Sequence, residues 1–246
     1  MRDPNSIVQA YELEEPPQII EMHEIPEYDL YDFDLNDDKS FKKYIQTVEK
    51  TVRSSYEYKA MVAFLREYMD MNQCAFYENL SNSDNLKIHI EIHHEPLSLY
   101  DISLIVYNKR VSFREPLDEE WVAKEVMYLH YNLMVGLIPL AETVHELVHA
   151  QYLFVPTSAV LGKYREFVDR YRDFMLPEQL DTLQHIEEAT EVYKDYDAKT
   201  ILSKNFIYVD MSGSYKIPKT EDVVSMLKDR LKEITDTRNS NQNTIH

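Results

Sequence analysis

The chain has 246 residues, 44% of them hydrophobic, and a formal net charge of −18 at pH 7. This length allows one large domain or two small ones, and the single cysteine, Cys74, excludes a disulfide framework and a cysteine-based zinc finger. No apolar run approaches the roughly 20 residues that a spanning helix needs, so we expect no membrane partner and a cytoplasmic location. The acidity also argues against nonspecific DNA affinity, since phosphate neutralisation requires lysine and arginine.

Most of the negative charge lies in residues 1–38, an N-terminal arm with twelve acidic residues, one arginine and four prolines. Its run EYDLYDFDL alternates acidic with aromatic and aliphatic side chains. This pattern is typical of a segment that binds a basic, partly apolar groove on a partner protein, or that mimics nucleic-acid phosphates. A disordered or loosely docked arm is the alternative. The rest of the chain carries only −7.

Residues 39–71 show apolar side chains at helical spacing, which predicts one or two helices. Residues 74–78 and 87–93 read as two strands of a β-hairpin, separated by a polar turn. In the second strand the isoleucines alternate with polar residues, and Pro96 ends the segment. We therefore expect a half-buried strand that finishes at the pair His93-His94.

Two helices are predicted next, over residues 99–109 with Ser98 as the N-cap and over residues 117–133. The run LIPL then reads as a strand, and the following helix carries His145 and His149. Together with residues 39–98, these elements form a predicted core spanning residues 39–155.

The remainder is predicted as a helical C-terminal region, residues 156–238, with a small hairpin and a polar tail. A long helix is expected from Pro177 to about residue 202. A hairpin follows, pairing residues 206–209 with 215–217, and a last helix spans residues 221–234. Residues 239–246 are the polar tail.

Six of the nine histidines lie between His89 and His149. His145 and His149 are one turn apart on the predicted helix, where their ring nitrogens can converge on one cation. Each histidine pair alone is more often a surface or structural pair. The combination of a strand ending in two histidines, a second strand and a helix with two more favours a metal site.

The segments HHEPL and GLIPLAETVHELVH resemble the two halves of the HNH (ββα-metal) endonuclease motif in its phage type. The resemblance covers about a quarter of the chain. It implies an α+β fold, mainly helical with a small antiparallel sheet, in which a ββα-metal motif carries a helical insertion at residues 97–134. It also implies His93, His145 and His149 as metal ligands and His94 as the general base.

Two features depart from the family pattern. Gly136 stands where the family has the asparagine that orients the base, and the cysteine knuckle of a second zinc is absent. Candidates for supporting roles are Asn132, Asn108, Glu95 and Glu146, and candidates for substrate binding are Lys87, Lys109, Arg110 and Arg114. His130 is interpreted as structural or exposed.

The resemblance implies a phage-encoded, metal-dependent endonuclease that hydrolyses phosphodiester bonds, with DNA as the expected partner, in the host cytoplasm. Three imidazoles favour one divalent ion of zinc, manganese or nickel, and a carboxylate from Glu95, Glu142 or Glu146 would make magnesium suitable. The first alternative is a catalytically degenerate HNH-like scaffold that binds a partner through its acidic surface. The second is a structural module that zinc stabilises. Oligomeric state stays open.

Overall fold

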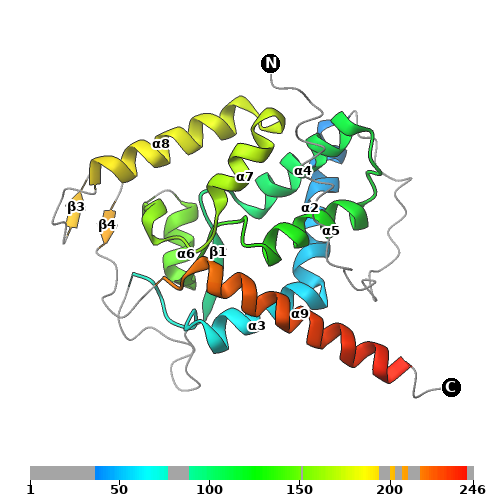
Figure 1. Cartoon of the computed structure of the whole chain (residues 1–246). Helices are drawn as coiled ribbons and strands as arrows, with labels where there is room; N and C mark the ends of the chain where they lie inside the picture. Colours follow the sequence, from blue (N-terminus) through cyan, green and yellow to red (C-terminus); the bar gives the residue numbers. More distant parts are fainter. Residues whose placement is uncertain are drawn as a thin grey trace.

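The computed structural model describes residues 37–76, 89–150, 152–193, 200–202, 207–209 and 217–242. These residues form a mainly helical molecule with a two-stranded antiparallel sheet at its centre and a second two-stranded pair at one edge (Figure 1). The predicted α+β class is confirmed. Lys87 and nearly all of the predicted acidic arm lie outside the described residues.

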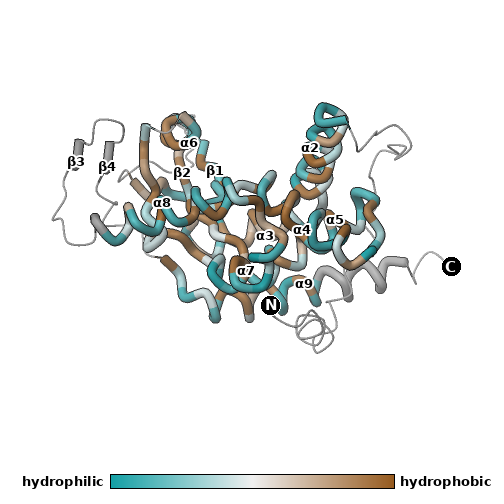
Figure 2. The backbone as a smooth tube through the Cα atoms, turned by 90° about the horizontal axis from the view of Figure 1, so that it is seen from above, coloured by the Kyte–Doolittle hydropathy of each residue, from teal (hydrophilic) through white to brown (hydrophobic). Residues whose placement is uncertain are grey.

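The first two helices, α2 (Asp38–Ser54) and α3 (Tyr56–Tyr68), are separated by Ser55. Its extended backbone ends α2, while its hydroxyl accepts from the Tyr58 amide and caps α3. α2 alternates in hydrophilic and hydrophobic bands in Figure 2, because its apolar side chains recur at helical spacing. Its buried face packs on α4 (Leu99–Phe113) and α5 (Glu119–Tyr131).

The predicted N-caps of α4 and α5 are present. Ser98 and Asp101 form a reciprocal capping box at the start of α4, and Asp118 accepts from the Trp121 amide at the start of α5. Such caps satisfy amide groups that have no partner within the helix. These helices form the predicted insertion between the two strands.

The central sheet pairs β1 (Ile90–His94) with β2 (Leu137–Ala141), and α6 (Glu142–His149) follows β2 directly. The order β1, β2, α6 is thus a ββα unit. β1 contributes to two apolar clusters along its length: Ile92 belongs to the larger cluster among the helices and Ile90 to a smaller one that includes Val144 of α6.

The predicted hairpin between residues 74–78 and 87–93 includes residues 77–78 and 87–88, which lie outside the described part of the chain. Within the described part, residues 74–76 form no strand and β1 pairs with β2. The Ala75 amide donates to the Pro139 carbonyl, so this stretch lies beside β2. Local turn signals favoured the short connection, but the apolar run LIPL is better buried beside β1.

The C-terminal region contains α7 (Tyr164–Tyr171), α8 (Pro177–Tyr193) and α9 (Thr220–Gln242). The predicted extension of the long helix to residue 202 is wrong, because β3 (Thr200–Leu202) pairs with β4 (Ile207–Val209). The predicted partner of residues 206–209 was 215–217, but β4 pairs with β3 in the structure. Residues 215–216 lie outside the described part. α9 continues past its predicted end into the polar tail, since no proline or glycine stops it there.

Gly136 lies where two backbone segments of the ββα unit come into close contact. A Cβ atom at this position would lie 1.8 Å from the Glu95 carbonyl oxygen and 2.6 Å from Val160 Cγ1. The Gly136 carbonyl also accepts from the Glu95 amide at 3.1 Å. The backbone segments that leave β1 and enter β2 therefore touch at a point where no side chain fits.

We expect Gly136→Ala to lower the free energy of unfolding by about 3 kcal/mol or more, and Gly136→Asn by more, because overpacking against backbone cannot relax through a rotamer. Urea denaturation followed by circular dichroism measures the change. Ser112→Ala, at an exposed position of α4, is the control and should stay within about 0.5 kcal/mol of wild type. A stable Gly136→Asn protein would contradict this packing.

Candidate metal centre

The two histidines at the end of β1 occupy separate environments. Successive side chains of a strand point to opposite faces, so His93 shares a face with Glu91 and His94 points the other way. α6 packs on the strands on the side of Glu91 and His93. His94 instead contacts α5 and α3.

Three imidazoles from two elements converge beside β1. His93 comes from the strand, and His145 and His149 come from consecutive turns of α6. One ring nitrogen of each lies within 4.8 Å of the other two, and the Nε2 atoms of His145 and His149 are 2.9 Å apart. The structure thus brings together the three residues that were predicted as metal ligands.

Glu91 orients this cluster from outside. Its Oε2 atom lies 2.5 Å from His145 Nδ1, so Nδ1 donates its proton to the carboxylate and Nε2 keeps a free lone pair. In the hydrogen bond between the two helical histidines, His149 Nε2 is then the donor. A metal ion can replace the proton of such a bridge. A carboxylate on the outer ring nitrogen is the usual support of a metal-binding histidine.

The protonation states suit metal binding. Burial, followed by the nearby charge of His93, lowers the pKa of His145 to about 4. The same two causes lower the pKa of His149. Both rings are therefore neutral at pH 7, which is the form in which histidine binds a metal.

The spacing also suits a tetrahedral ion. With Zn–N bonds of about 2.0–2.1 Å, ligand nitrogens lie about 3.3 Å apart, so His145 and His149 need to separate by only about 0.4 Å. Three nitrogen donors favour zinc and related ions over magnesium. Three protein ligands are also the number found in catalytic zinc sites, which leave the fourth position to water or substrate.

His94, predicted as the general base, belongs to a buried hydrogen-bond chain. It is 4% exposed, and its Nε2 atom lies 2.8 Å from His130 Nε2. His130 donates from Nδ1 to the Val126 carbonyl, so its Nε2 accepts and His94 Nε2 is the donor. Burial lowers the pKa of His94 well below its usual value. Only Nδ1 is then available to accept a proton from a substrate or water.

The predicted supporting asparagines bond elsewhere. The Asn108 amide donates to the Phe174 carbonyl at 3.0 Å, and the Asn132 amide donates to the Tyr128 carbonyl at 2.8 Å. The partner that orients His94 is His130, which is fully buried, in agreement with its structural interpretation. Glu95 lies 3.3 Å from His93 Nε2, where its carboxylate can hold the ring.

Of the predicted substrate-binding residues, Lys109 and Arg110 are internal. Lys109 Nζ lies 2.8 Å from Glu115, and Arg110 Nη1 lies 2.8 Å from Glu125, so both cations join α4 to α5 and to the loop between them. Arg114 is exposed at the C-terminal end of α4. Charge and sequence proximity suggested these residues, but burial assigns the first two to the core.

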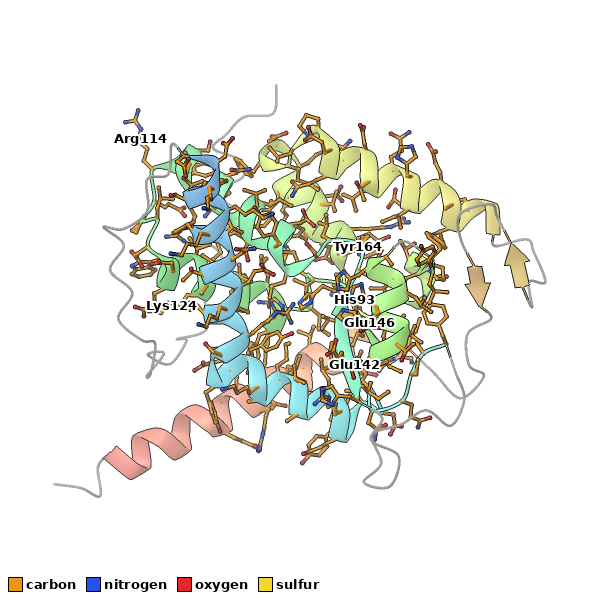
Figure 3. The ribbon with its side chains drawn as sticks, turned by 180° about the vertical axis from the view of Figure 1, so that it is seen from behind. His93, Arg114, Lys124, Glu142, Glu146 and Tyr164 are labelled. Atoms are coloured by element: carbon orange, nitrogen blue, oxygen red, sulfur yellow. The ribbon has the colours of Figure 1, made fainter. Side chains whose placement is uncertain are left out.

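Glu146, which was predicted as a supporting residue, also belongs to a recognised sequence motif. The segment His145-Glu146-Leu147-Val148-His149 matches H-E-x-x-H, which places two zinc ligands on one helix and a general base beside them. The sequence interpretation used only the histidine spacing. Glu146 is exposed, and within the described part of the chain its carboxylate has no hydrogen-bond or ion-pair partner. Figure 3 labels Glu142 and Glu146, which both belong to α6, together with His93 of β1.

A pocket of about 240 Å³ opens beside the histidines. Its wall contains all three cluster histidines, His94, Tyr58 and two arginines that the sequence interpretation missed, Arg53 and Arg66. The arginines come from α2 and α3, which lie about 30 residues before β1 in sequence, and only the tertiary packing brings them here.

The fold and the site together define a helical protein built around a ββα unit with a three-histidine cluster. A scan against protein-family models matches residues 5–215 to the bacteriophage G278-like virion proteins. The chain belongs to this family, so the predicted phage origin is confirmed. The match includes the whole histidine cluster but gives no support to the HNH endonuclease resemblance. No curated protein and no solved structure matches the chain. No helix of the described residues is long and apolar enough to cross a membrane.

The buried histidine chain should make the protein sensitive to acid. Burial lowers the pKa of His130 to about 4, against about 6.5 in the unfolded chain, so the unfolded state binds more protons between these values. Stability is full above pH 6.5 and falls as the pH drops to 4, by on the order of 3 kcal/mol from His130. Urea titrations across this range should show a shallower pH dependence for His130→Gln. His185→Gln, at an exposed histidine, should keep the wild-type slope.

Proposed function

We propose that this phage protein is a metal-dependent hydrolase that cleaves amide bonds of peptides. His93, His145 and His149 hold one zinc ion, and Glu146 is the general base. The observation that carries the proposal is the H-E-x-x-H helix whose two histidines converge with a third histidine from β1. The H-E-x-x-H helix is the motif that supplies two zinc ligands and the general base in zinc metallopeptidases.

The residues divide the chemistry between them. A metal ion held by the three histidines would supply a water of lowered pKa and would polarise the carbonyl of the scissile amide. In this proposal the Glu146 carboxylate would accept a proton from the attacking water and return it to the leaving nitrogen. Glu91 keeps His145 in the ligating tautomer, and Glu95 does the same for His93.

Phosphodiester hydrolysis is the second candidate, favoured by the order β1, β2, α6 and by histidines at the ligand positions of the HNH motif. In that mechanism His94 is the general base. Two observations weaken it. The hydrogen bond to His130 occupies Nε2 of His94, and Gly136 has no room for the family asparagine.

Metal binding should stabilise the fold. α6 has eight residues and one fully buried side chain, so it depends on contacts with β1 for its stability. Zinc at about 100 times its Kd adds about 2.7 kcal/mol, or roughly 5–10 °C in Tm for a chain of this size.

Scanning calorimetry with and without zinc, together with elemental analysis, measures this effect. His145→Ala should remove both the bound metal and the shift in Tm. His185→Ala, which alters an exposed histidine of α8, should keep both. A wild-type protein that binds no zinc, manganese or nickel overturns the metal site.

The catalytic assignment is tested by Glu146→Gln, which keeps the shape of the side chain and removes its basicity. We expect peptide hydrolysis to fall by about 10²–10⁴-fold while the zinc content stays at one per chain. Glu142→Gln, one turn earlier on α6, is the control and should change the rate little. Hydrolysis of a quenched fluorescent peptide library by zinc-loaded protein provides the readout.

The nuclease candidate is assayed on the same preparations with plasmid, single-stranded DNA and RNA, in the presence of Mg²⁺, Mn²⁺, Ni²⁺ or Zn²⁺. Nicking that His94→Gln abolishes and Glu146→Gln spares would replace the peptidase proposal. If metal binds and neither substrate class is cleaved, the metal-stabilised scaffold becomes the preferred function.

A further inference from the structure

The pocket beside the histidines is unusual in its charge. The chain carries −18 overall, yet two guanidinium groups, those of Arg53 and Arg66, line this pocket. Within the described residues neither group forms an ion pair with a carboxylate. Among the described residues of the pocket wall, the only glutamate is Glu91, which is engaged by His145. The two guanidinium groups therefore have no ion-pair partner within the described part of this wall.

Arg66 is held in place at the pocket wall. Its Nη2 atom donates to the Ile90 carbonyl at 2.6 Å, which fixes the guanidinium against β1. Its Nε atom is buried without an acceptor. A buried donor with no partner is costly, most of all on a charged group, and such groups recur where a ligand completes the site.

Arg53 is exposed on the last turn of α2 and can reorient toward a ligand. It is close enough to the cluster for its charge to contribute to the lowered pKa of both His145 and His149. A flexible arginine and a fixed one thus flank the three imidazoles. Arginine binds carboxylates through paired hydrogen bonds, which set orientation as well as affinity.

We propose that Arg53 and Arg66 form a specificity pocket for a carboxylate of the peptide substrate, so that the protein cleaves next to an acidic residue. This inference rests on the proposed peptidase function. The volume of about 240 Å³ is below the roughly 300–1,000 Å³ of sites for whole small molecules, and it suits one side chain of an extended peptide.

A single carboxylate fits the surroundings better than a nucleic acid. A polynucleotide brings a phosphate at every step along its backbone, and the chain outside the pocket is rich in acidic residues that would repel them. One carboxylate needs only the two arginines. The acidic residues then disfavour substrates with many negative charges, so a peptide with a single carboxylate is the preferred ligand.

The test measures binding in zinc-loaded Glu146→Gln protein, so it does not depend on turnover. Fluorescence anisotropy compares labelled peptides that differ only by glutamate or glutamine at each position around a central amide bond. We expect the glutamate peptide to bind about tenfold or more tightly at one position, as for a charge-assisted hydrogen bond. Adding Arg53→Gln or Arg66→Gln should abolish this preference, and Arg53→Lys should restore part of it.

Arg114→Gln, at an exposed arginine outside the pocket, is the matched control and should keep the preference. Circular dichroism identifies any unfolding in Arg66→Gln, and Arg53→Gln then decides alone because its side chain is exposed. Equal affinity for the two peptides overturns the carboxylate pocket. Tighter, Arg53-dependent binding of a single-stranded oligonucleotide also overturns it, in favour of phosphate recognition. If the protein hydrolyses peptides but shows no preference for acidic residues, only the carboxylate pocket is overturned. If it prefers acidic peptides but hydrolyses none, only the proposed peptidase function is overturned.

Discussion

The antiparallel pairing of β1 with β2 is the constraint on which the rest of the site depends. It fixes which side chains of β1 face α6, and the alternation of the strand then places Glu91 and His93 on that face and His94 on the other. A shift of the register by one residue would exchange these faces. Two strands alone are only marginally stable, so the helices on both sides must hold this register.

Gly136 shows how the backbone enforces that arrangement. Its carbonyl bonds to Glu95 directly after β1, and its missing side chain lets the two segments touch. The same close contact removes the place where a nuclease of the HNH type carries its asparagine. His130 replaces that residue as the partner of His94, from a helix inside the insertion. The order of elements thus resembles the ββα-metal motif, while the chemistry around His94 differs from it.

The sequence was a good guide wherever the information was local. Helical spacing, the caps Ser98 and Asp118, and the one-turn separation of His145 and His149 all depend on neighbours a few residues away. The predictions that differ from the structure concern contacts between residues far apart in the sequence. Turn residues suggested a hairpin before β1, but the strand pairs across about 40 intervening residues with a more apolar partner. The arginines of the pocket come from α2 and α3, and no local pattern places them beside histidines. The H-E-x-x-H pattern around Glu146 is also local, but the sequence prediction used only the spacing of the two histidines.

The protein contains one buried histidine group and one partly buried group, and the two differ in how their ring nitrogens are satisfied. His94 and His130 form a closed chain that ends on the Val126 carbonyl, so every proton in it has an acceptor within the protein. In the cluster of His93, His145 and His149, the Nε2 atoms of the helical pair share one hydrogen bond, and the Glu91 carboxylate accepts from the outer nitrogen of His145. Such a group has more lone pairs than protons directed at its centre. Under the proposed function, a divalent ion would occupy that centre. In that proposal the two arginines of the pocket wall lie beside the bound ion, and the exposed Glu146 follows the ligand His145 directly on α6.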